Sequence, residues 1–186
     1  MKEVEILVEV LDSQDLVLNK LKKFKSKGAR KIIDLYFYHP EKENMQVMNK
    51  RYPTEWLRLR KMGDKQYLAY KLDYFEGSKW LYSDEHETEI SDIEAMKKIL
   101  SSLGFKKLLE LKIQKETFLT DDYEIDLEDV ENLGLFLEVE RLNLNDSEDV
   151  TKVKKEIQQF IDDLSIKVSE ELNFGKPELM LKKIKE

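Results

Sequence analysis

The sequence predicts a single-domain α+β protein in which about eight β-strands are braced by helices. Three observations support this class. Apolar and polar residues alternate along eight separate segments, and apolar residues recur at helical spacing along three others. No Gly/Ser-rich linker or low-complexity tract interrupts the chain, so residues 1–186 are expected to form one domain.

The amount of charge is high for a chain of this size. Its 186 residues are enough for one full hydrophobic core, and 41% of them are hydrophobic. Charged residues make up 38%, which is more than the surface of such a domain typically carries. Some of the charge is therefore expected inside the fold.

The sign of the charge and the residue types exclude several classes of partner. A formal net charge of −7 argues against nucleic acid, because phosphate-backbone binding needs a basic face. Cysteine is absent, which excludes disulfides and thiolate metal sites. Without an apolar signal segment or a run of about 18 apolar residues, the chain is expected to be cytoplasmic and free of membrane contact. A monomer or a homodimer is expected.

Three segments have helical periodicity with start and stop signals. The first begins at Ser13 as the N-cap and ends at Gly28. The second begins with Ser91 and Glu94, spaced as a capping box. The third, about 147–172, is long enough to brace a sheet.

Period-2 alternation predicts the strands, and short connections separate most of them. The expected strands span residues 2–10, 30–38, 55–62, 65–73, 78–90, 107–119, 122–128 and 134–143. Residues 39–54 form the long irregular connection among them.

Charged residues alternate with apolar ones on several of these strands, and their signs are segregated. The charged positions of one parity are Glu3, Glu5, Arg58, Arg60, Lys71, Glu85, Glu87, Glu89, Lys112, Glu138 and Glu140. Spacing alone allows two arrangements: a one-sided sheet whose charged face meets water, or a barrel with a charged lumen. The grouping of arginines and lysine on the middle strands favours the barrel.

Several motifs together resemble one known family. They are "EVE" near the start, "LRLR", "YLAYK", "ETEI" and "LEDVENLGLFLEVE" at 127–140. In register over residues 3–140, these motifs resemble the CYTH domain of the triphosphate tunnel metalloenzymes, which include class IV adenylyl cyclase and thiamine triphosphatase. The resemblance implies a closed eight-stranded antiparallel barrel, a triphosphate tunnel, that binds a nucleoside or other small-molecule triphosphate with Mg²⁺ or Mn²⁺.

The resemblance also assigns roles to individual residues. Phosphate binding falls to Arg58, Arg60, Lys71, Lys112 and Lys115. Metal binding falls to Glu3, Glu5, Glu87, Glu128, Glu138 and Glu140. The chemistry agrees, because arginine forks grip phosphate oxygens and carboxylates are hard ligands for these ions.

Three departures from the family pattern bear on activity: Leu7, and Ser83 and Lys115, which stand where many members carry arginine. The family opens with Glu-x-Glu-x-Lys, whereas Leu7 stands here at the lysine position. Three functions therefore remain open. The first is an adenylyl cyclase-like reaction from ATP to cyclic AMP and pyrophosphate, the second is an inorganic or organic triphosphatase, and the third is a catalytically weakened triphosphate-binding protein.

Overall fold

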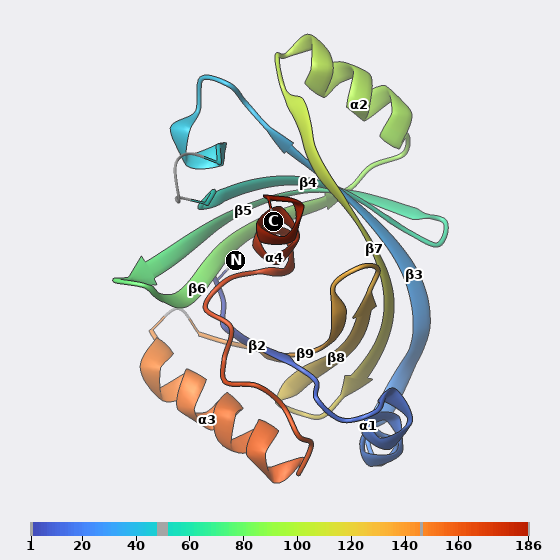
Figure 1. Ribbon diagram of the computed structural model, residues 1–186, viewed down its shortest axis with the longest axis vertical. Coiled ribbons are helices and arrows are strands. Elements are labelled where there is room, and N and C mark those ends of the chain that lie inside the picture. Colours follow the sequence, from blue (N-terminus) through green and yellow to red (C-terminus); the bar gives the residue numbers. More distant parts are fainter. Residues whose placement is uncertain (1, 48–51, 146, 186) are drawn as a thin grey trace.

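The computed structural model describes residues 2–47, 52–145 and 147–185, and its strands form one antiparallel sheet that curls into a nearly closed barrel (Figure 1). The strands are β1 (Lys2–Glu3), β2 (Glu5–Glu9), β3 (Lys25–Tyr38), β4 (Glu55–Met62), β5 (Lys65–Glu76), β6 (Lys79–Glu89), β7 (Lys106–Leu119), β8 (Tyr123–Val130) and β9 (Gly134–Arg141). Their order in the sheet is β1-β6-β5-β4-β3-β7-β8-β9-β2. The predicted barrel is confirmed, and the one-sided sheet is wrong.

The N-terminal segment joins the two edges of the sheet. β1 pairs with β6, whereas β2, which follows after Val4, pairs with β9. One expected strand, 2–10, is thus divided into two, because its two halves pair with different neighbours. The described barrel consequently has nine strands rather than eight.

A segment from the other end of the chain seals the seam between β2 and β6. The amide of Leu172 donates to the carbonyl of Leu7 on β2, at 2.8 Å. The side-chain oxygen of Asn173 accepts from the amide of Trp80 on β6, at 3.2 Å. Sequence ends that are far apart therefore complete the barrel together.

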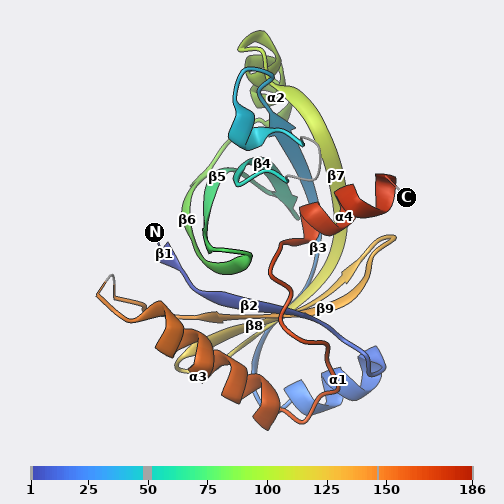
Figure 2. The ribbon, with the colours of Figure 1, turned by 60° about the vertical axis from the view of Figure 1, so that its left-hand side comes forward.

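The helices cover the barrel from outside and across one opening. They are α1 (Gln14–Leu21), α2 (Ile93–Ser102), α3 (Val150–Asp163) and α4 (Lys176–Lys185), with a short 3-10 helix at Glu43–Met45 in the long connection. In both views α1 and α3 lie outside the β2–β9–β8 wall and α2 lies at the far end of the molecule (Figures 1 and 2), whereas α4 is seen end-on within the ring of strands (Figure 1).

The main apolar core lies between the barrel wall and the outer helices. Ile6 and Val8 of β2 pack with Ile157 and Ile161 of α3, and each of these side chains is at most 1% exposed. Successive strand residues point to opposite faces of the sheet. Because the apolar residues of these strands are buried against the outer helices, the charged residues that alternate with them point into the barrel. Hydrophobic packing outside thus fixes which residues line the lumen.

Two expected helix boundaries are wrong: the C-terminal end of α1 and the N-cap of α2. α1 ends at Leu21, and Gly28, with φ of 86°, lies at a pairing irregularity within β3 rather than at a helix end. α2 is capped by Asp92 instead of Ser91, since the Asp92 carboxylate accepts from the amides of Glu94 and Ala95 at 2.9 Å. The aspartate satisfies the free helix amides one residue later than expected.

The third helix is shorter than expected. It ends at Asp163 because Ser165 adopts a left-handed φ of 54°, and the chain beyond it runs along β2 as the seam segment. None of the helices in the described residues is long and apolar enough to cross a membrane.

The outer core should dominate stability. Replacing Ile157, which is fully buried, by alanine is expected to lower the free energy of unfolding by about 2–5 kcal/mol through lost burial and a residual cavity. Ile99→Ala is the control, since Ile99 is 50% exposed and its loss should change stability by less than about 0.5 kcal/mol. Urea denaturation measures both, and equal midpoints would show that α3 does not hold the wall.

Candidate functional site

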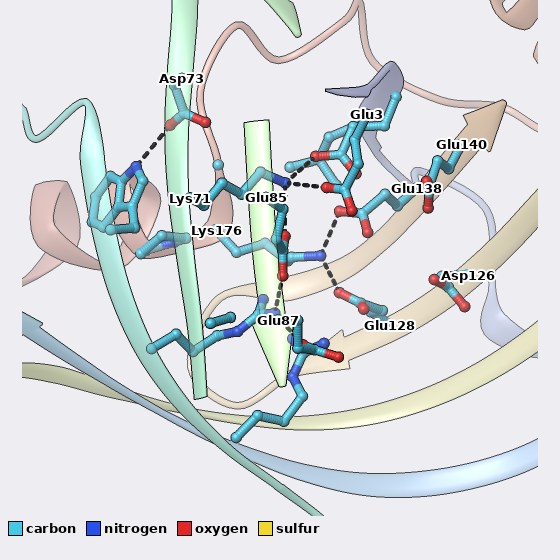
Figure 3. Close-up of a pocket in the computed structure, with 18 of the residues that line it drawn as sticks. Glu3, Lys71, Asp73, Glu85, Glu87, Asp126, Glu128, Glu138, Glu140 and Lys176 are labelled. Carbon is cyan, nitrogen blue, oxygen red and sulfur yellow. Dashed lines mark hydrogen bonds and ion pairs between the residues drawn. The ribbon is translucent and has the colours of Figure 1, made fainter. Parts of the chain in front are cut away.

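The barrel lumen contains a strongly charged pocket of about 270 Å³ (Figure 3). Ten acidic and five basic side chains line it. The acidic ones are Glu3, Glu5, Asp73, Glu85, Glu87, Glu124, Asp126, Glu128, Glu138 and Glu140, and the basic ones are Arg58, Arg60, Lys71, Lys115 and Lys176. The two arginines lie on β4 and four of the carboxylates on β8 and β9, and ion pairs join the basic and acidic side chains around the pocket.

Two arginines project from β4 into the pocket. Arg60 makes two parallel hydrogen bonds of 2.7 Å to the buried carboxylate of Asp34. Arg58 donates to Glu85 at 2.7 Å and to Glu87 at 3.1 Å. Its Nε is buried and has no hydrogen-bond partner among the described residues. A buried donor of this kind is costly to leave unpaired.

Lys71 connects the β5 wall to the seam. Its ammonium lies 3.0 Å from Glu5 and 3.3 Å from Glu3, both on the N-terminal segment. A third carboxylate, that of Glu85, lies 3.7 Å away. Lys71 therefore sits at the border between the basic wall and the acidic one.

The acidic wall is built by β8 and β9. Asp126 and Glu128 alternate on β8, and Glu138 and Glu140 alternate on β9, with Asp126 paired in register with Glu138. Carboxylate oxygens of Asp126, Glu128 and Glu138 all lie within 4.8 Å of one another. Lys115 contacts Asp126 and lies 3.6 Å from Glu128, so part of this charge is neutralised.

Lys176 enters the same cluster from α4. Its ammonium contacts Glu128 and donates to Glu138 at 2.6 Å, and Figure 3 shows it between the two carboxylates. Burial opposes the ionisation of Glu138, but the charges of Lys176 and Lys115 outweigh it and lower the pKa of Glu138 to about 2. Glu138 is thus held as an anion.

Other carboxyl groups in the pocket have too few positive charges nearby to offset their burial and mutual repulsion. Burial raises the pKa of Glu140 to about 8, and repulsion from Glu5 and Glu3 adds to the rise. Burial likewise raises the pKa of Glu3 to about 7 and that of Asp126 to about 6, against the attraction of nearby lysines. The pocket therefore has room for further positive charge.

The donor set fits a hard divalent cation. The cluster of Asp126, Glu128 and Glu138 offers carboxylate oxygens alone, which is the ligand type that Mg²⁺ and Mn²⁺ prefer. A bare polyanion would be repelled by ten carboxylates facing five cations, whereas a cation that accompanies it would offset the excess. The pocket suits an anion and a metal together better than either alone.

The structure gathers all but one of the residues assigned to the site from sequence. Glu3, Glu5, Arg58, Arg60, Lys71, Glu87, Lys115, Glu128, Glu138 and Glu140 line the pocket. Lys112 does not, because it lies three residues from Lys115 and so falls on the opposite face of β7. Its side chain is 53% exposed and pairs with Glu131 at 3.3 Å, so its expected place in the lumen is wrong.

The pocket also contains residues that the sequence reasoning did not assign. Glu85 belongs to the charged parity of the predicted strands but had no binding role assigned, and Asp126 shares the parity of Glu128, so extending the alternation by two positions predicts it. Lys176 carries no such signal, because it starts a helix whose position depends on packing against the barrel mouth. Leu7, at the family's lysine position, is 1% exposed and packs with Met180 and Leu181 of α4.

Comparison with known proteins agrees with the fold and the motifs. The CYTH domain model matches residues 1–172. A protein of Methanocaldococcus jannaschii named "Putative adenylate cyclase" is 32% identical over 171 residues, which cover 89% of this chain and 91% of that protein.

Solved structures share the fold at lower identity. The PH1012 protein of Pyrococcus horikoshii aligns with a TM-score of 0.77 at 24% identity, covering 95% of this chain and 98% of its own. HpAC1 from Hippeastrum, described as a "Putative adenylyl cyclase" that reveals a dominant triphosphatase activity, aligns with a TM-score of 0.65 at 15% identity, covering 97% of this chain and 96% of that chain. With the barrel, the charged lumen and the family model in agreement, the chain belongs to the CYTH domain family.

Proposed function

We propose that this protein is a metal-dependent enzyme that acts on the triphosphate group of a small molecule, with cyclisation of ATP as its first candidate reaction. The observation that carries the proposal is the division of one lumen into an arginine-bearing wall on β4 and a carboxylate wall on β8 and β9. An extended anion that carries a cation is the ligand that matches both walls at once.

The basic wall is suited to phosphate oxygens. Arg58 and Arg60 are two residues apart on β4, so their guanidinium groups project to the same side. Arg60 is held by Asp34, and Arg58, which also lines the pocket, has a buried Nε without a partner among the described residues. Arginine forks bind phosphate through two parallel hydrogen bonds, which supports a role for this wall in holding the triphosphate.

The acidic wall is suited to the metal. Asp126, Glu128 and Glu138 would hold it, with Glu3, Glu5 and Glu140 completing the acidic surroundings. Bound there, Mg²⁺ or Mn²⁺ supplies charge neutralisation at the phosphate oxygens. The protein groups then bind the chain of phosphates, fix its direction along the lumen and limit the access of water.

Two reactions fit this arrangement and differ in the attacking oxygen. In cyclisation, the ribose 3′-oxygen attacks the α-phosphorus, the hydroxyl proton is lost and pyrophosphate leaves. In hydrolysis, water attacks the terminal phosphorus, and a diphosphate and inorganic phosphate are formed. The name of the 32%-identical relative supports the first reaction, and the dominant triphosphatase activity ascribed to HpAC1 supports the second.

The local structure around Leu7 bears on the third possibility, a weakened binding protein. Leu7 pairs in register with Glu138, the carboxylate that Lys176 binds at 2.6 Å. A lysine ammonium is therefore present beside this position, although α4 supplies it instead of β2. This supports an active enzyme over a protein that only binds.

Product analysis tests the proposal directly. The full chain is incubated with ATP, tripolyphosphate or thiamine triphosphate and with Mg²⁺ or Mn²⁺, and the products are separated by chromatography. We expect metal-dependent conversion of ATP to cyclic AMP and pyrophosphate. Formation of ADP and phosphate, or cleavage of tripolyphosphate alone, would instead assign a triphosphatase. If calorimetry detected binding without any product, the protein would be a binder and the enzymatic proposal would fail.

The role of the unpaired Arg58 donor can be tested by a change that keeps the charge. Arg58→Lys retains an ion-pair partner for Glu85 but removes the fork and its free Nε, so tripolyphosphate affinity in the presence of Mg²⁺ should fall roughly 10- to 100-fold, equivalent to about 1.5–3 kcal/mol. Calorimetry measures the affinity.

Arg141→Ala provides the matched control for Arg58→Lys. Arg141 pairs outside the pocket with Asp122 and Glu156, both 3.7 Å away, so tripolyphosphate affinity should stay unchanged when it is replaced. Wild-type affinity in Arg58→Lys would reject the assigned role.

A further inference from the structure

Lys176 occupies the position between two of the three carboxylates that fit a metal ion. Its ammonium contacts Glu128 and lies 2.6 Å from Glu138, and both carboxylates belong to the cluster with Asp126. Glu128 is 1% exposed and Lys176 is 9% exposed, so solvent screens this contact little. In the protein alone, two carboxylates of the acidic wall are therefore already paired with a cation of the same chain.

The backbone on both sides of Lys176 is anchored, so the ammonium is held in this position by the fold. Before it, the seam segment is fixed by the hydrogen bond from Leu172 to Leu7. At the helix start, the amide of Gly175 donates to the Glu178 carboxylate at 2.8 Å, as in a capping box. After it, Met180 and Leu181 pack into the apolar end of the lumen.

An ammonium and a divalent cation compete for the same oxygens. A Mg²⁺ ligand oxygen lies about 2.0–2.1 Å from the metal, and the lone pairs used there are no longer available to an N–H donor. Two cations placed within a few ångströms in a buried site also repel each other strongly. Lys176 bonds the Oε2 atoms of Glu128 and Glu138, so a metal that takes these oxygens displaces it, and a metal on the other oxygens of the same carboxylates is repelled by its ammonium.

We propose that Lys176 is a built-in counter-ion that couples metal binding to triphosphate binding. The inference rests on the proposed function and specifies how the same site is regulated. Without an anion in the lumen, displacing Lys176 leaves a buried ammonium unpaired, so metal binds weakly. When a triphosphate is present, the displaced ammonium gains phosphate oxygens as partners, so metal and triphosphate strengthen each other's binding, as linkage requires.

Metal affinity in the absence of any triphosphate tests the proposal without relying on turnover. Mn²⁺ binding to the full chain is measured by electron paramagnetic resonance for wild type, Lys176→Met and Lys154→Met. Lys176→Met should bind Mn²⁺ at least tenfold more tightly than wild type, because two carboxylates lose their internal competitor.

Lys154→Met is the matched control for this change. Lys154 is also a buried helical lysine, 4% exposed, but it pairs with Glu171 and does not line the pocket. Its Mn²⁺ affinity should equal that of wild type.

The coupling itself is measured by adding tripolyphosphate. In wild type, tripolyphosphate should raise Mn²⁺ affinity at least tenfold beyond the chelation measured in buffer, and in Lys176→Met this gain should shrink several-fold. Equal or weaker Mn²⁺ binding by Lys176→Met in the absence of tripolyphosphate would overturn the proposal. If wild type and all variants bound neither Mn²⁺ nor tripolyphosphate, the proposed function itself would be rejected.

A wild-type measurement covers the case in which Lys176→Met fails to fold. The side-chain ammonium of Lys176 is followed by nuclear magnetic resonance during titration with Mg²⁺ and then with tripolyphosphate. We expect its signal to shift as Mg²⁺ enters and to shift again when the anion binds. A Lys176 signal that stays unchanged while Mg²⁺ binds would overturn the proposal equally.

Discussion

The structure depends on enclosing many like charges in one lumen and neutralising enough of them for the protein to fold. Ten carboxylates face five cations there, and a buried ion without a partner costs several kcal/mol. The protein meets this cost with bidentate and shared ion pairs: Arg60 with Asp34, Lys71 with Glu5 and Glu3, and Lys176 with Glu128 and Glu138. The carboxylates left over define the charge that a ligand complex has to supply.

Packing outside the barrel makes this interior charge tolerable. Apolar residues on the outer face of the barrel pack against α1, α2 and α3. The free energy gained by burying these residues offsets the cost of enclosing the charged residues on the inner face. At the seam, strands β2 and β6 do not pair with each other. The segment ending at Asn173 bridges them and then leads directly into Lys176, so closure of the barrel and placement of its last cation are linked.

Alternation along strands made most of the lumen predictable from sequence. Because period 2 is a property of the backbone, the pairs Arg58/Arg60 and Glu138/Glu140 had to share a face, and the predicted strand 55–62 agrees with the structure residue for residue. The helix ends were less predictable, since Asp92 and Ser91 are both good caps and the choice depends on local geometry. Lys112 and Lys115 cannot both face the lumen, because strand residues three apart point to opposite faces, and Lys112 is the one that points outward.

Long-range placement explains what sequence reasoning missed. Nothing local to "KPELM" indicates that Lys176 reaches a carboxylate cluster on β8 and β9, because the position of α4 is set by Met180 and Leu181 packing at the barrel mouth. The same packing explains why Leu7 is compatible with the family's site: an apolar side chain suits a wall that the helix covers.

The central claim is that one lumen holds a triphosphate against β4 and its metal against β8 and β9. Crystals grown with Mn²⁺ and tripolyphosphate, examined by anomalous diffraction at the manganese edge, test it most directly. We expect a manganese peak beside Glu138 and Glu128, with phosphate density reaching Arg58. Manganese and phosphate bound outside the barrel, or phosphate density along the β8–β9 wall with none near Arg58, would contradict it.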